Sequence, residues 1–145
     1  MWQEFLKVIK KKYDINLMKF ISLFESITRT NVIDAFELED IIYFVIQEGQ
    51  IVKAVGKQGI NYKKLENIIK KKIRMVENSR DINKFIQNVL HPIKLANIEV
   101  EPEKVTLTAP DIKSRGIIIG RGGANLKNLE NIVKRYFDIK EIKIN

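Results

Sequence analysis

The sequence predicts an α+β protein that is built from two similar halves. Residues 55–68 read VGKQGINYKKLENI and residues 119–132 read IGRGGANLKNLENI, and the two segments correspond position for position. Runs rich in β-branched residues and runs with helical spacing of apolar residues surround each copy in the same order. Self-similarity at a fixed offset indicates that one supersecondary unit occurs twice, so we expect each half to have its own strands and helices.

In the first half, the element order follows from the pattern of apolar residues. LMKFISLFESI (17–27) places its apolar residues on one helical face, which predicts an amphipathic helix. VIDAFEL (32–38) and IIYFVI (41–46) have the β-branched and aromatic composition of strands. GQIVKAV (49–55) predicts a short helix before the glycine motif, and KKIRMVE (71–77) predicts a strand after the motif helix.

The second half repeats this order, with helix, strand, strand and short helix before its motif. These elements are expected at INKFIQNVL (82–90), ANIEVE (96–101), VTLTAP (105–110) and PDIKSRGIII (110–119). Ile142 and Ile144 alternate with charged residues and predict the last strand. Asp81 is the expected N-cap of the first of these helices, and Pro92 is expected to end it.

The segment NSRD (78–81) is the only connection between the halves, so we expect a tandem of two small domains. The expected domains are residues 17–78 and 79–145, each with a three-stranded sheet packed against helices. Residues 1–16 lie outside the repeat, and we expect them to form a helical N-terminal extension.

The positive charge is concentrated on the repeated segments. The chain has a formal net charge of +8 and a pI near 9.6. Residues 50–74 hold eight Lys and Arg against one acid, and residues 111–136 hold six against two. Residues 30–52 instead contain five acids and neither Lys nor Arg. This placement favours a surface for a polyanion, nucleic acid first, over a lysine-rich surface that serves solubility alone.

Each motif places a Gly-X-X-Gly loop between two predicted helices, GKQG at 56–59 and GRGG at 120–123. The free N–H groups and the positive dipole end of the second helix then point at whatever binds the loop. Lys57 and Arg121 add positive charge, so a phosphodiester backbone is the natural ligand; the alternative is a structural helix–turn–helix corner with glycine as C-cap. The candidate binding residues are Gly56, Lys57, Gln58, Gly59, Asn61, Lys63, Gly120, Arg121, Gly122, Gly123, Asn125 and Lys127.

The helix after each loop carries two stripes of residues. One is apolar and expected in the core: Leu65, Ile68, Ile69, Leu129, Ile132 and Val133. The other is polar and fits either a nucleic-acid track or a solvated face: Lys63, Asn67, Lys70, Lys127, Asn131 and Lys134. Glu66 and Glu130 are expected to form ion pairs at i+4 with Lys70 and Lys134.

The (I/V)-G-X-X-G pattern between two helices, flanked by strands, resembles the KH module, whose GXXG loop clamps about four nucleotides of backbone. In both halves the additional helix and strand precede the core, which resembles the prokaryotic, type II arrangement. The tandem is similar to the archaeal NusA-like transcription factors, and FESIT (24–28), VGKQG, FIQNVLHPIKLANIEVE and RYFDIKEIKI carry the likeness across residues 17–145.

This resemblance implies single-stranded RNA binding during transcription, in elongation, pausing or termination. It implies that bases lie over an apolar groove beside each loop, where Ile60, Ile117 and Ile118 are candidates for either the groove or the core. The implied partners are single-stranded RNA and RNA polymerase, and we expect a monomer.

Other functions fit the sequence less well. A KH-type factor for rRNA or ribosome maturation shares the site chemistry, and a protein-interaction scaffold would make the glycine corners structural. An enzyme is not expected, because the lone His91 has no catalytic partners and no acids or histidines have metal-ligand spacing. We expect no cofactor, no metal, no small-molecule substrate and no membrane partner. The absence of cysteine and of a long apolar run predicts a soluble, cytoplasmic protein.

Overall fold

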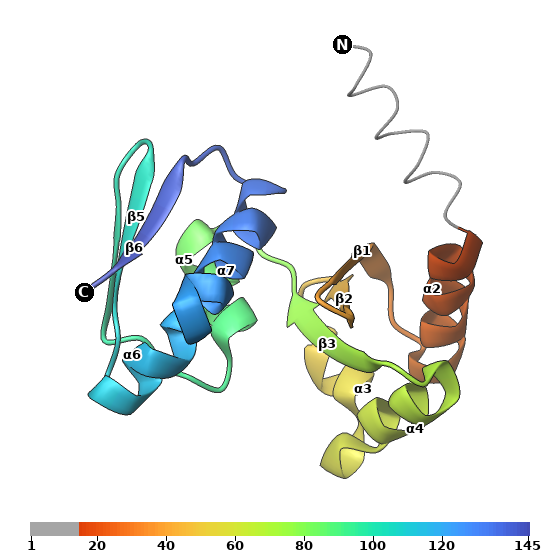
Figure 1. The fold of residues 1–145 in the computed structure, drawn as a ribbon. Helices are drawn as coiled ribbons and strands as arrows, with labels where there is room; N and C mark the ends of the chain where they lie inside the picture. Colours follow the sequence, from red (N-terminus) through yellow and green to blue (C-terminus); the bar gives the residue numbers. More distant parts are fainter. Residues whose placement is uncertain (1–14) are drawn as a thin grey trace. The chain divides into compact units, whose positions relative to one another are not determined.

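The computed structural model describes residues 15–145, and the chain divides after Val76 into two compact units. Each unit contains a three-stranded sheet and helices, so the predicted α+β architecture is confirmed (Figure 1). The helical extension predicted for residues 1–16 lies outside the described residues except for its last two, which begin the first helix. Within the described part of the chain, no helix is long and apolar enough to cross a membrane.

The first unit follows the predicted element order. Its elements are α2 (Ile15–Thr28), β1 (Val32–Leu38), β2 (Ile41–Ile46), α3 (Ile51–Val55), α4 (Ile60–Ile69) and β3 (Lys72–Glu77). The strand order is β1-β2-β3, and β1 pairs antiparallel with β2 through a tight turn at Glu39 and Asp40. The core lies between the sheet and the helices, where the rings of Phe24 on α2 and Phe44 on β2 stack at 4.4 Å. Both rings are fully buried, so α2 is fixed to the sheet at this point.

The second unit repeats the order. Its elements are α5 (Ile82–Leu90), β4 (Asn97–Val100), β5 (Lys104–Thr108), α6 (Ile112–Ile119), α7 (Ala124–Lys134) and β6 (Glu141–Ile144). Central strand β5 pairs antiparallel with β4 and parallel with β6. Phe85 of α5 is fully buried and meets the ring of Tyr136 edge-on, with centroids 5.2 Å apart.

The helix starts use the caps that the sequence indicates. The Asp81 carboxylate accepts the N–H of Asn83 at 3.1 Å, which confirms the predicted N-cap of α5. Asp111 caps α6 by accepting the N–H of Ser114 at 2.6 Å, and this hydrogen bond lowers the pKa of the Asp111 carboxyl. Helix α5 ends at Leu90, ahead of Pro92 as expected.

The burial predicted for the apolar stripes of α4 and α7 is confirmed except at one position. Five of the six residues are buried, but Ile68 is 51% exposed, whereas its counterpart Ile132 is 2% exposed. The stripe of α4 that faces the sheet is centred on Tyr62, Leu65 and Ile69. At about 100° per residue, Ile68 lies at the margin of that stripe, on the side away from Tyr62, and so it remains in solvent.

Candidate nucleic-acid interface

The two glycine loops fold with the same backbone. Gly56 and Gly120 leave the preceding helix with φ/ψ of 76°/169° and 73°/177°. One left-handed turn follows two residues later, at Gln58 (55°/28°) and Gly122 (64°/19°). Gly59 and Gly123 are also left-handed and lead directly into α4 and α7. The sequence repeat is therefore also a repeat of loop conformation.

In each loop the backbone N–H groups at the two central positions face no internal partner. Gly59 N–H donates to the Gly56 carbonyl at 3.1 Å, and Gly123 N–H donates to the Gly120 carbonyl at 3.2 Å. Among the hydrogen bonds of residues 15–145, none uses the N–H groups of the residues between these glycines. The first turns of α4 and α7 contain no acid. Free donors and the positive end of the helix dipole thus coincide at each loop.

Asn61 and Asn125 tie the two helices of each corner together. The Asn125 side-chain amide donates to the carbonyl of Ile117 on α6 at 2.9 Å, and the Asn61 amide donates to the carbonyl of Lys53 on α3 at 3.3 Å. The sequence named both asparagines only as candidate binding residues. Their equal spacing from the loops, in both halves, was the available sign of this structural role.

The first glycine of each loop is required by this asparagine. A Cβ on Gly120 would lie 2.5 Å from the Asn125 Cγ, and a Cβ on Gly56 would lie 2.9 Å from the Asn61 Nδ2. Gly122 and Gly123 have no heavy atom within 4 Å of such a Cβ. The third and fourth positions of this loop thus have open space in front of them, and a ligand can approach the backbone there.

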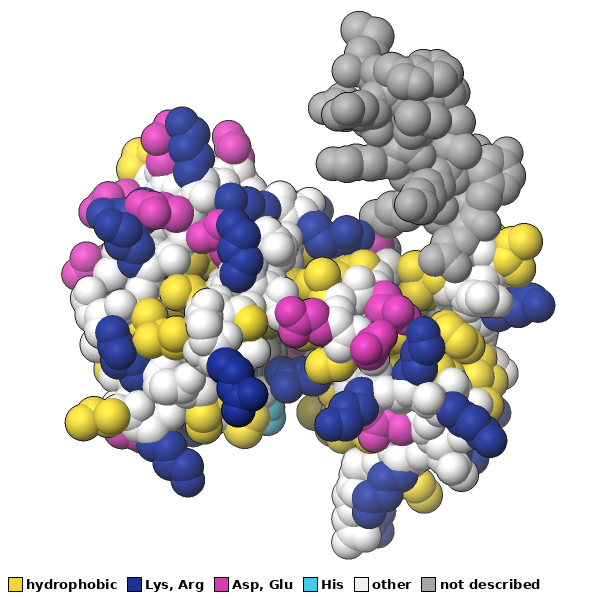
Figure 2. Space-filling model, viewed as in Figure 1, with side chains coloured by type: hydrophobic (Ala, Val, Ile, Leu, Met, Phe, Trp, Pro, Cys, Tyr) yellow, Lys and Arg dark blue, Asp and Glu magenta, His cyan; other side chains and the backbone are white. Residues whose placement is uncertain are grey.

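The structure brings the candidate residues of each unit together on one corner. Lys57, Gln58 and Lys63 are exposed around the first loop, and Arg121 and Lys127 are exposed around the second. In the view of Figure 2, Lys and Arg side chains gather over α3 and α4, and acidic side chains gather over the β1–β2 hairpin. The charge segregation expected from the sequence therefore exists on the folded surface of the first unit.

The three candidate groove residues differ in their exposure to solvent. Ile60, directly after the first loop, is 59% exposed, and Ile117, before the second loop, is 52% exposed. Ile118 is only 3% exposed and belongs to the core of the second unit, so a groove role for it is wrong. Adjacent residues on α6 point to different sides, which periodicity alone did not resolve in an uninterrupted run of isoleucines.

Tyr62 is the aromatic side chain nearest the first loop in sequence, and it serves the core. Its hydroxyl accepts the N–H of Met75 on β3 at 2.7 Å. Burial raises the pKa of the Tyr62 hydroxyl, although the Met75 hydrogen bond opposes this shift. The ring therefore links α4 to β3 and is not presented for base stacking.

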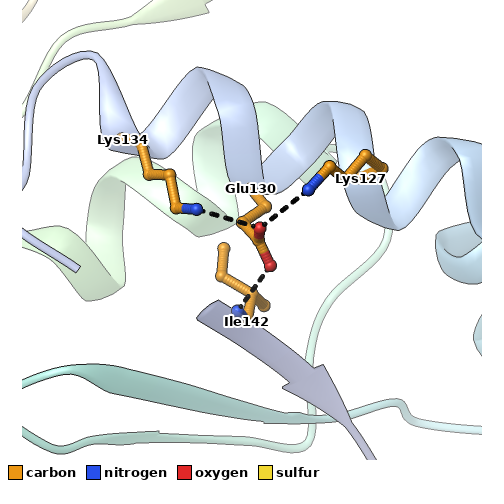
Figure 3. Close-up of polar contacts among 4 residues, drawn as sticks. All are labelled: Lys127, Glu130, Lys134 and Ile142. Carbon is orange, nitrogen blue, oxygen red and sulfur yellow. Dashed lines mark hydrogen bonds and ion pairs between the residues drawn. The ribbon is translucent and has the colours of Figure 1, made fainter. Parts of the chain in front are cut away.

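Glu130 lies at the centre of a polar cluster on α7 (Figure 3). Its carboxylate accepts from Lys134 at 3.1 Å, lies 3.5 Å from the Lys127 Nζ, and accepts the backbone N–H of Ile142 on β6 at 3.1 Å. Burial raises the pKa of Glu130, but the Ile142 hydrogen bond and the two lysines outweigh it and hold the pKa below its ordinary value. The predicted i+4 pair with Lys134 is confirmed.

Sequence reasoning missed the contact of this glutamate with the next strand. In the first unit Glu66 makes the same contact, accepting the N–H of Ile73 on β3 at 3.0 Å. The expected ion pair between Glu66 and Lys70 is wrong: no such pair occurs among the described residues, and Lys70 follows α4 in the left-handed region with φ 61°. The only sign of a strand contact was the glutamate at the same place in both halves. No group of three potential metal ligands occurs among the described residues.

The curated proteins that resemble this chain share one name. No protein-family profile matches the chain. Three curated relatives are named "Probable transcription termination protein NusA". The protein of Methanococcus vannielii is 37% identical over 127 residues, which cover 86% of this chain and 73% of the relative. That of Methanocaldococcus jannaschii is 32% identical, with 86% and 69% covered, and that of Thermoplasma acidophilum is 29% identical, with 90% and 93% covered.

A solved structure has a similar fold. The crystal structure of APE1850 superposes with a TM-score of 0.73 at 26% identity, covering 88% of this chain and 96% of that one. Two of the curated relatives exceed 30% identity across more than two thirds of their own length. The chain belongs to the family of archaeal NusA-like proteins.

Proposed function

We propose that this protein is a single-stranded RNA-binding factor of transcription, and that it grips the RNA backbone with its two GXXG loops. The observation that carries the proposal is the pair of loops with closely similar backbone angles. Each loop has N–H groups without a partner among residues 15–145, a helix N-terminus and a basic side chain. The names of the curated relatives contain "transcription termination", which supports a role in transcription. Elongation and pausing use the same contact with nascent RNA and belong to the same proposal.

We further propose that each unit is a type II KH domain. A strand–helix–helix–strand core, β2-α3-α4-β3 or β5-α6-α7-β6, contains the loop between its two helices. In both units a helix and a strand, α2-β1 or α5-β4, precede this core. The bounds that we propose for these domains are those expected from the sequence, 17–78 and 79–145, which are close to the observed division after Val76.

RNA phosphates would meet the loops from the open side of the glycines. The N–H groups of Lys57 and Gln58, or of Arg121 and Gly122, would donate to phosphate oxygens, assisted by the dipole of the following helix. The basic side chain in each loop adds a charge-assisted contact. These contacts position the strand but carry no sequence information, so bases would be read beside the loop, where Ile60 and Ile117 are exposed.

The proposed partners are single-stranded RNA and, through the transcription complex, RNA polymerase; the protein would act as a monomer in the cytoplasm. The twelve candidate residues lie at or beside the two proposed loop sites, and Asn61 and Asn125 shape the loops from within. Linking two RNA-binding domains raises apparent affinity by effective concentration, so we expect the tandem to bind a long strand more tightly than either loop alone permits.

Charge-matched loop variants test the proposal. One variant carries Lys57→Asp with Gln58→Asp, and a second carries Arg121→Asp with Gly122→Asp. A control carries Lys19→Asp with Ser22→Asp on the exposed face of α2, and all three variants change the net charge by the same amount. Binding of a fluorescent single-stranded RNA would be measured by anisotropy at two salt concentrations, with circular dichroism to confirm folding.

We expect each loop variant to lose about tenfold or more in affinity and to show a shallower salt dependence, because phosphate contacts are lost. The control should lose far less, since it changes only the long-range field. If folded loop variants bind RNA as well as the control does, the loops are structural corners and the proposed function is wrong.

A further inference from the structure

The two loops share a backbone but differ in the charges around them. In the first unit Lys57, Lys63 and Lys64 are exposed, and none of the ion pairs recorded for residues 15–145 involves them. In the second unit Lys127 takes the position of Lys63, and its Nζ lies 3.5 Å from the Glu130 carboxylate. The uncharged Asn128 takes the position of Lys64.

Glu130 is a fixed charge. Its side chain is only 13% exposed, and the backbone N–H of Ile142 holds one carboxylate oxygen while the other faces Lys127 and Lys134 (Figure 3). The carboxylate is ionised at neutral pH, as an ordinary glutamate is, and these contacts lower its pKa further. Both lysines of α7 therefore have an internal counter-charge beside them. A phosphate would have to compete with Glu130 for each of them.

The equivalent glutamate of the first unit leaves its lysines available. Glu66 accepts from the strand N–H of Ile73, as Glu130 accepts from Ile142. Helix α4 ends at Ile69, however, and Lys70 has a left-handed backbone and is in no ion pair of the described residues. Lys63, at the place of Lys127, is in no recorded ion pair of the described residues.

We infer that the two RNA sites are electrostatically unequal. The first loop and α4 supply the larger share of the salt-dependent affinity, through Lys57, Lys63 and Lys64. Glu130 holds Lys127 and Lys134 back from RNA, so the second loop binds through Arg121 and its own N–H groups. This inference rests on the proposed function and assigns Glu130 as a residue that limits the affinity of the second site.

The expected size follows from counterion release. One phosphate contact on a single strand contributes a slope of about 0.7 to log K against log salt concentration, so its loss lowers affinity about fivefold at 0.1 M relative to 1 M salt. Lys63→Gln should therefore lower RNA affinity by about three- to fivefold at 0.1 M salt. Lys127→Gln should lower it by less than about twofold, because the charge of Lys127 is already paired with Glu130.

Two glutamine substitutions provide the decisive comparison. Glu130→Gln and Glu66→Gln each remove one negative charge, and each retains a side-chain oxygen that can accept the strand N–H. We expect Glu130→Gln to raise RNA affinity by about threefold and to steepen the salt slope, because two lysines are released. Glu66→Gln should change affinity by less than about 1.5-fold, and adding Lys127→Gln to Glu130→Gln should remove part of the gain.

The outcomes separate this inference from the function on which it rests. If the loop-acid variants abolish RNA binding but Glu130→Gln and Glu66→Gln behave alike, the two sites are equal and only the inference is wrong. If Lys127→Gln weakens binding as much as Lys63→Gln, the inference is also overturned. If the loop-acid variants have no effect on binding, the proposed function itself fails.

Discussion

Replacing Gly120 by alanine tests how the second loop is built. Gly120 has φ/ψ of 73°/177°, a region that is essentially restricted to glycine, and a Cβ there would lie 2.5 Å from the Cγ of Asn125. The asparagine would have to move, and its 2.9 Å hydrogen bond to the carbonyl of Ile117 would be lost. Gly122→Ala is the matched control, because Gly122 also has positive φ but nothing within 4 Å of its would-be Cβ.

The two substitutions should lower the free energy of unfolding by clearly different amounts. For Gly120→Ala, backbone strain of about 2 kcal/mol and a lost hydrogen bond of about 1 kcal/mol give a loss of about 3 kcal/mol in the free energy of unfolding. For Gly122→Ala, the left-handed conformation alone costs about 1 kcal/mol. The corresponding position in the first unit is Gln58, a non-glycine residue at φ 55°, which shows that this place accepts a side chain.

Urea unfolding followed by far-ultraviolet circular dichroism would measure both losses, and a double-mutant cycle would isolate the contact. In an Asn125→Ala background, Gly120→Ala should cost about 1 kcal/mol less than in the parent, since no asparagine remains to be displaced. Equal losses for Gly120→Ala and Gly122→Ala, or a cost unaffected by Asn125→Ala, would refute the reasoning.

Three further predictions concern the core and the polar links between helices and strands. Ile118→Ala should lower the free energy of unfolding by about 3 kcal/mol and Ile117→Ala by less than about 1 kcal/mol, because only the first is buried; similar losses in urea unfolding would contradict the assignment. Tyr62→Phe should cost about 1–2 kcal/mol by leaving the Met75 N–H without its acceptor, and an unchanged thermal midpoint would speak against that hydrogen bond. Burial raises the pKa of Glu130, but its hydrogen bonds and the two lysines lower it by more, so the folded-state pKa lies below the ordinary value. The stabilisation by the ionised carboxylate is therefore fully present above about pH 4.5 and is lost as pH falls through the folded-state pKa. The stability difference between the parent and Glu130→Gln, measured by urea unfolding across this range, should therefore shrink on acidification, and a constant difference would count against the ionised carboxylate.

The repeat made much of the fold predictable from the sequence. Because the two halves could be aligned, weak strand signals such as ANIEVE (96–101) gained support from stronger ones such as VIDAFEL (32–38). The element order, the loops between two helices and the cap at Asp81 follow from short-range patterns of polarity and hydrogen bonding. These features depend on neighbours in the chain, which is where sequence reasoning is strongest.

What the sequence did not reveal depends on contacts between distant segments. Ile68 and Ile118 occupy apolar positions whose burial is decided by which side of the helix meets the sheet. The sequence predicts Asn125 as a ligand contact but does not show that its side chain also donates to a carbonyl eight residues earlier. The sequence predicts Lys134 as the partner of Glu130 but not Ile142, since that contact spans twelve residues and joins a helix to a strand.

The most direct test of RNA binding at the loops is an NMR titration of the ¹⁵N-labelled protein with a short single-stranded RNA. The account predicts that the largest amide shift changes fall on Lys57, Gln58, Arg121 and Gly122 and on the first turns of α4 and α7. It also predicts that saturating the shifts requires more RNA as salt is raised. Shift changes concentrated on other surfaces, with the loop amides unmoved at saturating RNA, would contradict it.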